Sequence, residues 1–253
     1  MVLYLIGIGL GKDDISLKGL DAARNSNKIW LDAYTSPLLF ELSALEKLIG
    51  KKIQLASREL VEQKPEESLF KGAKDANNAL LVVGDPFAAT THIDLVLRAL
   101  KQGIEVKVIH SASVFTAVAE TGLQLYKFGK TASIPFPEKG YLPETPYEIL
   151  KQNQSISAHT LFLLDLKPDE NRFVTIADAI ALLQKIELLR NEKVFTADTL
   201  CIGCSRLGSE DQKIKVGKAK ELLKQDFGKP PHCLIVPSKL HFVEEEALKR
   251  FLV

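Results

Sequence analysis

The chain has little excess charge of either sign. Its 253 residues carry 33 Lys and Arg against 32 Asp and Glu, so we expect no basic surface of the kind that binds nucleic acid or anionic membranes. No apolar run approaches the roughly 18 residues of a membrane-spanning helix. The start, Met1-Val2-Leu3-Tyr4, lacks the basic segment of a signal peptide. We expect a cytoplasmic protein that binds neither nucleic acid nor membrane.

Cysteine is also scarce, with three residues in the chain. Cys201 and Cys204 have redox or metal-ligand spacing, but they lie in an apolar segment that predicts a strand. Positions three apart on a strand point to opposite faces, so these thiols cannot easily pair or share a metal. No second pair completes a zinc site, and Cys233 is isolated. We interpret all three as core residues in a reducing compartment and predict no metal.

Two apolar segments of strand length each run into a glycine-containing turn. Residues 80–83 precede Gly84-Asp85-Pro86, and residues 2–6 precede Gly7-Ile8-Gly9-Leu10-Gly11. In an open α/β sheet, small ligands bind beyond the carboxyl ends of the strands. Two such turns in one chain predict one ligand held between two loops, although each turn is equally compatible with a simple tight connection.

The first turn does not fit a dinucleotide site. That site requires Gly-x-Gly-x-x-Gly opening a helix, with an acidic residue about 20 positions later. Asp32 lies at a suitable distance, but the glycines are at 7, 9 and 11, and Lys12-Asp13-Asp14 intervenes before a helix can begin.

Strand and helix patterns alternate along the whole chain, which predicts α/β layers. Beyond about residue 110 the expected strands lengthen, and a proline-rich loop interrupts the alternation. We therefore predict an N-terminal α/β domain over 1–110 and a C-terminal α/β domain with a mixed sheet over 111–253. After the first strand, the expected strands are 28–34, 52–57, 80–84, 104–109, 125–134, 159–166, 199–206 and 232–238.

Three helix starts are marked in the sequence. Ser36-Pro37 places an N-cap before proline, in a helix that Gly50 ends. Thr145-Pro146-Tyr147-Glu148 has the pattern of a capping box. Thr175 opens a helix whose apolar stripe contains Ile176, Ile180, Leu183 and Ile186.

Several segments in this order resemble the diphthine synthases, a family within the tetrapyrrole-methylase-like class of S-adenosylmethionine methyltransferases. The resemblance extends from residue 3 to about residue 250. The Gly-Asp-Pro turn is shared by the wider class. The segments that carry the resemblance are Gly7–Gly11, Ala33-Tyr34-Thr35-Ser36, Gly84-Asp85-Pro86 with Ala89-Thr90-Thr91-His92, His110-Ser111-Ala112-Ser113, Ala158–Leu161 through Leu164-Asp165-Leu166, Asp226–His232 and Lys239-Leu240-His241.

The resemblance implies two α/β domains with S-adenosyl-L-methionine in the cleft between them and S-adenosyl-L-homocysteine as product. It implies methylation of the amino group of a 3-carboxy-3-aminopropyl arm on a histidine of elongation factor 2, a step of diphthamide biosynthesis. Archaeal forms are associated with three N-methylations, and eukaryotic forms add a methyl ester. It also implies a homodimer, which agrees with apolar residues that one sheet would leave uncovered, such as Phe40, Phe70, Phe115 and Phe128.

The family's cofactor contacts can be transferred residue by residue. Position 88 carries Ala where Val or Leu is more usual, and Leu207 follows Ser205-Arg206 where the family often has Ala-Arg. The cofactor positions are Leu10, Asp85, Ala88, Ser113, Val114, Leu164, Leu207 and His232.

The methyl group of a sulfonium is already electrophilic, so its transfer depends chiefly on the placement of the acceptor and on a neutral amine. Asp85 or Asp165 is a possible proton acceptor, and we assign no catalytic base.

Structural roles compete with several of these assignments. Asp85 before proline can shape a turn, and Ser113 can cap the helix 114–121. His92 and His232 both allow a structural interpretation, which we keep for the remaining histidines, His110, His159 and His241. Two other functions stay open: a tetrapyrrole or rRNA methyltransferase of the same fold, and a non-catalytic nucleotide-binding regulator.

The proline-rich loop 135–144 is the candidate contact with elongation factor 2. It contains Phe136 and Tyr141 and departs from the regular alternation around it. Aromatic residues are enriched in interface cores, and functional residues often lie on loops. An ordinary connector remains the alternative.

Overall fold

The computed structural model describes residues 2–73, 76–137 and 140–253. The chain divides into two compact units. The first is Met1–Ala117 with two short later segments, Pro168–Glu170 and Gly208–Glu210, and the second contains the remainder. The sequence places the boundary slightly earlier, after residue 110. Within the described ranges, no helix is long and apolar enough to span a membrane.

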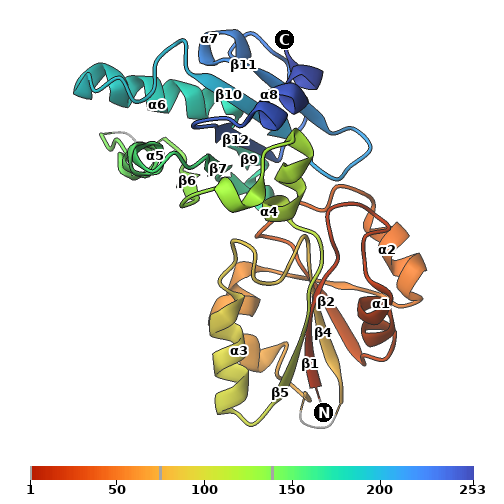
Figure 1. The fold of residues 1–253 in the computed structure, drawn as a ribbon. Coiled ribbons are helices and arrows are strands. Elements are labelled where there is room, and N and C mark those ends of the chain that lie inside the picture. The colour runs from red at the N-terminus through yellow and green to blue at the C-terminus, as the bar shows by residue number, and fades with distance from the viewer. Residues whose placement is uncertain (1, 74–75, 138–139) are drawn as a thin grey trace. The chain divides into compact units, whose positions relative to one another are not determined.

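The first unit is built on a five-stranded parallel sheet (Figure 1). The strand order is β3-β2-β4-β1-β5, and every neighbouring pair is parallel. The strands are β1 (Val2–Gly7), β2 (Lys28–Asp32), β3 (Gln54–Ala56), β4 (Asn78–Val82) and β5 (Glu105–Ile109). The predicted strands of this half therefore exist, each within a few residues of its expected position.

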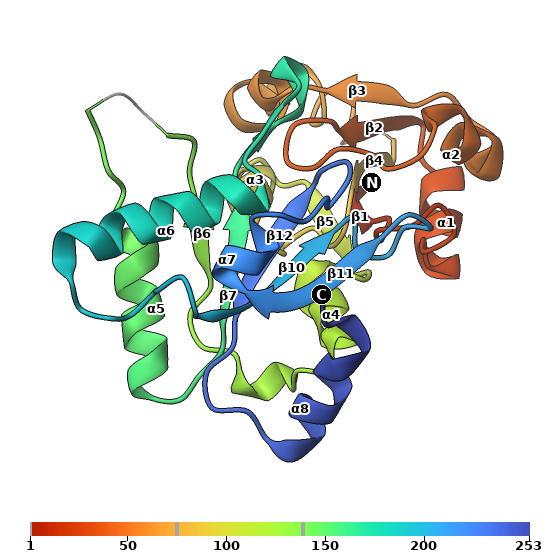
Figure 2. The ribbon, with the colours of Figure 1, turned by 90° about the horizontal axis from the view of Figure 1, so that it is seen from above.

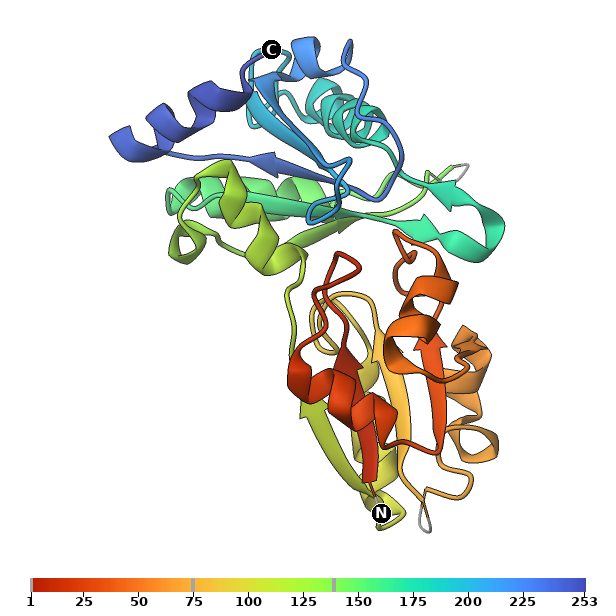
Figure 3. The ribbon, with the colours of Figure 1, turned by 90° about the vertical axis from the view of Figure 1, so that its right-hand side faces the viewer.

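Helices cover both faces of this sheet. Helices α1 (Leu17–Arg24) and α2 (Leu42–Ile49) lie on one face, toward the viewer in Figure 3, and α3 (His92–Lys101) lies on the other. Alternate residues of β1 face the two layers, with Leu3 and Leu5 in the core beneath α3 and Ile6 in the core beneath α1. The period of two along a strand buried on both faces explains its continuous apolar sequence.

The second unit contains a mixed five-stranded sheet of order β11-β10-β12-β7-β6. Only the β6–β7 pair is parallel, so the expectation of a partly antiparallel sheet is confirmed. The strands are β6 (Ala132–Ile134), β7 (Thr160–Leu164), β10 (Leu200–Ser205), β11 (Lys213–Lys218) and β12 (His232–Val236). A small hairpin, β8 (Leu166–Lys167) and β9 (Arg172–Phe173), follows β7. β8 begins at the last residue of the expected strand 159–166, and β9 and β11 have no counterpart among the predicted strands.

Helices α5 (Thr145–Ser155), α6 (Ile176–Arg190) and α7 (Ala219–Leu222) contribute to the core of this unit, and α5 and α6 lie on one side of the sheet (Figure 2). The predicted stripe of α6 is confirmed, because Ile176, Ile180, Leu183 and Ile186 are all fully buried. Thr175 and Asp178 form the capping box at its start, which satisfies two backbone N–H groups that would otherwise lack partners.

The long strand expected over 125–134 is wrong. Residues Leu125–Lys127 form a 3₁₀ turn, and only Ala132–Ile134 is strand. The turn is held by Glu244, whose carboxylate accepts the backbone N–H of Gln124 and the Lys127 ammonium. Such side-chain contacts from a distant helix override a local apolar pattern.

Two predicted helix starts also need correction. Helix α2 begins at Leu42 with Glu41 as N-cap, not at Pro37, because Leu38 and Phe40 pack against the core from an irregular segment. Helix α5 begins at Thr145 as expected, but its cap residue is Glu144 and no capping box forms. The Glu148 carboxylate pairs instead with Arg190. Gly50 does end α2, with φ +81°.

The three cysteines are free and buried. Strand β10 contains both Cys201 and Cys204, as predicted. Cys233 is isolated in sequence but lies opposite Cys204 on the neighbouring strand β12. Burial raises the pKa of the Cys201 thiol, so this residue stays protonated and behaves as a small core side chain.

A buried ionic network fixes helix α8 (Phe242–Leu248) in the second unit. The Glu244 carboxylate accepts backbone N–H groups of Gln124 (3.0 Å) and His241 (2.8 Å), the Lys127 ammonium and His159 Nε2 (3.1 Å). His159 Nδ1 accepts the Ser238 N–H, so the neutral ring carries its proton on Nε2. Burial opposes ionisation of Glu244, but these donors outweigh it and lower the pKa of Glu244 to about 2.

Replacing Glu244→Gln should lower the free energy of unfolding at pH 7 by about 2–4 kcal/mol, because the Lys127 ammonium and the His159 ring lose their ionised partner. A carboxyl whose pKa is lowered on folding stabilises above its unfolded pKa and loses that contribution as pH falls. Wild type should therefore lose stability between about pH 4.5 and pH 2, and Glu244→Gln should lose less. Urea unfolding at several pH values measures this, and parallel pH profiles would contradict it.

Candidate functional site

The first sheet reverses the direction of its connections between β1 and β4, which are neighbours. From β1 the chain passes through α1 toward β2, and from β4 it passes through α3, on the opposite face, toward β5. The loops after these two strands therefore diverge. Ligands of open α/β sheets bind at this kind of point, outside the carboxyl ends of the strands.

The two glycine turns meet there. Gly9 donates its N–H to the Gly84 carbonyl (3.2 Å), and Gly84 donates to the Gly9 carbonyl (2.8 Å). Gly9 has φ +75° and Gly84 φ +81°, a conformation that glycine adopts without strain. A Cβ on Gly9 would also lie 2.1 Å from Cβ of Asp14. The turns identified in the sequence are thus joined into one edge by their backbones.

Asp85 links this edge to the end of β5. Its Oδ1 accepts the Phe87 N–H (2.9 Å), and its Oδ2 accepts His110 Nδ1 (2.8 Å) and the Ser111 N–H (3.1 Å). Burial opposes ionisation, but these hydrogen bonds outweigh it and lower the pKa of Asp85. Asp85 therefore shapes its turn, as one of the two interpretations of the sequence expected, and its cofactor role stays a prediction.

Asp14 organises the turn that contains Leu10. Its Oδ2 accepts the N–H groups of Leu10 (3.0 Å) and Gly11 (2.7 Å), and its carbonyl accepts the Ser111 hydroxyl (3.1 Å). The Leu10 N–H is thus already used, which leaves its carbonyl and side chain for a ligand. Sequence reasoning noted Asp14 only as an interruption before the first helix.

The other three predicted contacts of the first unit lie near the same edge. Ala88 closes the Asp85 turn by donating to the Asp85 carbonyl (3.2 Å). Ser113 lies beside Gly84, where its Cβ is 3.8 Å from the place that a glycine Cβ would occupy. Its carbonyl accepts the N–H groups of Thr116 and Ala117, and Val114 begins the short helix α4 (Val114–Ala117).

The remaining three predicted contacts share one edge of the second sheet. Leu164 ends β7, Leu207 follows β10, and His232 begins β12, which is antiparallel to both strands. Leu164 and Leu207 are buried. His232 Nε2 lies 3.3 Å from the Gly228 carbonyl, and its buried Nδ1 has no hydrogen-bond partner among the described residues. Burial lowers the pKa of His232, so Nδ1 of the neutral ring is a free acceptor.

The buried side chain of His92 contacts the backbone of the Gly-Asp-Pro turn. Its Nδ1 lies 2.9 Å from the Pro86 carbonyl and its Nε2 3.1 Å from Asp32 Oδ2, with both side chains fully buried. The Nδ1 contact ties His92 to the Gly-Asp-Pro turn, whereas the buried Nε2 makes no hydrogen bond among the described residues. Asp32 also accepts N–H groups of Tyr34 and Thr35, so it is not free to bind a ribose, in agreement with the rejected dinucleotide site.

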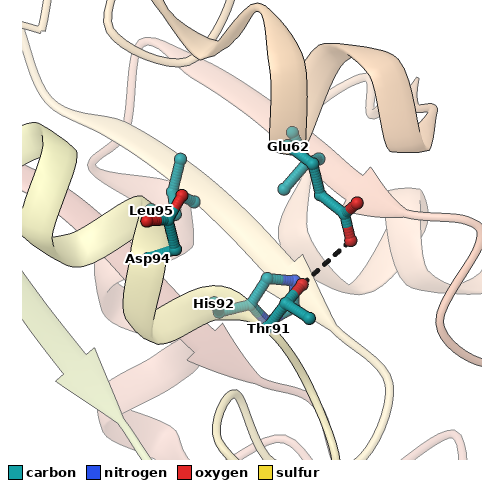
Figure 4. Close-up of a pocket in the computed structure, with 6 residues that line it drawn as sticks. Glu62, Thr91, His92, Asp94 and Leu95 are labelled. Carbon is teal, nitrogen blue, oxygen red and sulfur yellow. Dashed lines mark hydrogen bonds between the residues drawn. The ribbon is translucent and has the colours of Figure 1, made fainter.

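A pocket of about 140 Å³ lies between the start of α3, which includes His92, and the segment that contains Glu62 (Figure 4). Glu62 accepts the Thr91 hydroxyl across it (2.9 Å). None of the predicted cofactor contacts lines this pocket, whose walls are Val61, Glu62, Thr91, His92, Asp94 and Leu95.

Comparison with known proteins fixes the family. The family model for tetrapyrrole (corrin/porphyrin) methylases matches residues 2–223. The chain belongs to this family. It is similar to the probable diphthine methyl ester synthase of Arabidopsis thaliana (46% identity, 98% of this chain and 97% of that protein) and to the diphthine synthase of Methanocaldococcus jannaschii (45%, 98% of each).

A solved structure agrees with the fold. The crystal structure of a putative diphthine synthase from Entamoeba histolytica has a TM-score of 0.91 and 40% identity, and it covers 100% of this chain and 98% of that one. The predicted α/β fold of the tetrapyrrole methylase type is confirmed. The predicted enzyme class, an S-adenosylmethionine-dependent methyltransferase, is confirmed as well.

Replacing Asp85→Ala should weaken binding of S-adenosylhomocysteine by about 10- to 100-fold, or about 1–3 kcal/mol, because three donors lose their acceptor and the turn reorganises. The core is not opened, so the fold should persist. Calorimetry measures the affinity and circular dichroism the fold. The control is Asp94→Ala, an exposed carboxylate on α3 that lines the separate pocket. Equal affinity of Asp85→Ala and wild type would reduce Asp85 to a turn former.

Proposed function

We propose that this chain methylates the amino group of the 3-carboxy-3-aminopropyl-histidine of elongation factor 2, a step of diphthamide biosynthesis. The observation that carries the proposal is similarity over the full length to proteins named for this step, the diphthine synthases and diphthine methyl ester synthases. Elongation factor 2 acts in translation, so we propose that the reaction takes place in the cytoplasm.

S-adenosylmethionine is the proposed methyl donor, and the residues present fit it. The first unit offers the carbonyl of Leu10 and the Asp85 carboxylate. The second unit offers the apolar side chains of Leu164 and Leu207 and the unpartnered acceptor His232 Nδ1. Apolar walls with a few placed polar groups are typical of cofactor sites.

When bound, the donor supplies a methyl group that is electrophilic because its sulfur is positively charged. The protein then needs no oxyanion-type stabilisation, and its task is to place the acceptor nitrogen in line and to keep it neutral. A free alkyl amine has a pKa of about 10.4, so most of it is protonated at neutral pH. Desolvation and a proton acceptor are the two means by which side chains can deliver the neutral form.

The direct test is incubation of the enzyme with labelled S-adenosylmethionine and elongation factor 2 that carries the unmethylated arm. We expect label on the modified histidine, with mass spectrometry counting the methyl groups. Elongation factor 2 without the arm is the control and should stay unlabelled. Label on RNA or on a tetrapyrrole, but none on the protein, would contradict the proposal in favour of another acceptor.

We also propose that the loop 135–144 contributes to contact with elongation factor 2. Glu138 and Lys139 lie outside the described residues. Phe136 packs against the core of the second unit, and the Arg172 guanidinium lies 4.7 Å from its ring centre. Tyr141 is 61% exposed. Tyr141 is therefore the better candidate for contact, and Phe136 is an anchor of the loop.

Tyr141→Ala should leave S-adenosylhomocysteine affinity unchanged and lower kcat/KM for the protein substrate by about tenfold, as expected for loss of an exposed aromatic contact. The control is Leu188→Ala, an exposed apolar residue of α6 outside the loop, which should keep the wild-type rate. Wild-type rates for Tyr141→Ala would exclude this role, and the segment Tyr34-Thr35-Ser36 would be tested next.

We propose that the protein is a homodimer. The sequence argument for this is partly wrong, because Phe70 is buried within the first unit and Phe40 packs against its core. Exposed apolar side chains are instead present on the turn before β6 and at the start of α8, where Tyr126 and Phe242 are 82% and 73% exposed. Their segments are joined through Glu244, and we propose that a second copy covers both side chains.

Sedimentation at micromolar concentration should give about twice the chain mass of 28.0 kDa, because an obligate interface of more than about 2,000 Å² does not dissociate at that concentration. Phe242→Glu should shift the mass toward one chain. A single-chain mass for wild type would reject the dimer, and a dimer that resists Phe242→Glu would reject this surface.

A further inference from the structure

His110 stands at the end of β5 with one ring nitrogen held and the other exposed to solvent. Its Nδ1 lies 2.8 Å from Asp85 Oδ2, and its side chain is 69% exposed. Its Nε2 has no hydrogen-bond partner among the described residues. Sequence reasoning assigned His110 a structural role, although it follows a strand directly at the same edge as the glycine turns.

The surroundings of Asp85 decide which nitrogen carries the proton. The carboxylate is ionised and is fixed by the N–H groups of Phe87 and Ser111, and an ionised carboxylate only accepts hydrogen bonds. Nδ1 of His110 must therefore donate. In the neutral ring, Nε2 then carries the lone pair. An orienting carboxylate, a held Nδ1–H and a free Nε2 are the arrangement by which a histidine acts as a general base.

We propose that His110 is the general base of the methyl transfer, accepting a proton from the substrate amine at Nε2, with Asp85 orienting its ring. This inference rests on the function proposed above. The ammonium group of the arm loses one proton to Nε2, and the freed nitrogen lone pair forms a bond to the methyl carbon. The carbon–sulfur bond breaks, and its electron pair stays on sulfur.

Repeated transfer makes such a base useful. Each N-methylation consumes one lone pair and leaves a cationic nitrogen, so conversion of an ammonium to a trimethylammonium group releases three protons for three methyl groups. Because the His110 ring is largely exposed, Nε2 can return each proton to water before the next transfer. A fully buried ring such as that of His92 has no such exit.

Few groups affect the charge on this ring. Among the described residues, Asp85 is the one charged group that contacts it, and the ring of Phe87 meets it edge to face with centroids 6.2 Å apart. The contact with Asp85 engages Nδ1 alone, so it orients the ring without occupying Nε2.

Nitrogen NMR of the enzyme without ligands tests the geometry independently of activity. The His110 ring at high pH should be in the Nδ1–H form, whereas a free imidazole favours the other tautomer, and Asp85→Asn should remove this preference. A ring in the Nε2–H form in wild type would contradict the proposal.

Two substitutions separate a base from a residue that only positions the turn. In His110→Asn the amide can still donate to Asp85 but no basic nitrogen remains, whereas His110→Ala removes both. Both variants should transfer methyl groups at least about 100-fold more slowly, the lower end of typical general-base contributions. Affinity for S-adenosylhomocysteine should stay within about twofold of wild type. The acidic limb of the pH–rate profile should disappear, and added imidazole should raise the rate of His110→Ala but not of wild type.

The outcomes distinguish the two proposals. If wild type methylates elongation factor 2 and His110→Asn does so equally well with the same pH profile, His110 is a positioning residue and not the base. If wild type transfers no methyl group to that substrate, the proposed function fails. The NMR tautomer still reports on the ring in that case.

Discussion

The pair of backbone hydrogen bonds between Gly9 and Gly84 is the constraint on which the candidate site depends. It joins the loops after β1 and β4 at the point where the sheet reverses its connections. Both residues need a left-handed backbone, and a side chain on Gly9 would collide with Asp14. Asp85 then ties this edge to the end of β5. Asp14 accepts a backbone N–H of the first turn, and His92 contacts a backbone carbonyl of the second.

Much of the first unit could be predicted because its signals are local. Continuous apolar strands followed by glycine turns indicate a parallel sheet, and the turns themselves predict where a ligand binds. The start of α6 at Thr175 could also be predicted, although the capping box that forms there was expected only at Thr145. The sequence did not show that Gly9 and Gly84 would be hydrogen-bonded to each other, because that depends on β1 and β4 becoming neighbours.

The errors lie where distant residues decide the local structure. Residues 125–131 resemble a strand, but Glu244, more than 100 positions later, holds Gln124 and Lys127 in a turn. Glu148 has the spacing of a capping box but pairs with Arg190 of another helix. The role proposed for His110 was not considered from the sequence for the same reason. Its neighbour Asp85 is 25 positions away in the chain, and no local pattern reveals that pair.

The central claim is that S-adenosyl ligands bind at the edge formed by the two glycine turns. Amide chemical shifts of the labelled protein, recorded during titration with S-adenosylhomocysteine, test this most directly. The account predicts the largest shifts at Gly9, Gly84, Asp85 and Ser113 in the first unit, and at His232 in the second. Shifts centred on Glu62, Thr91 and Asp94, with these residues unchanged, would contradict it.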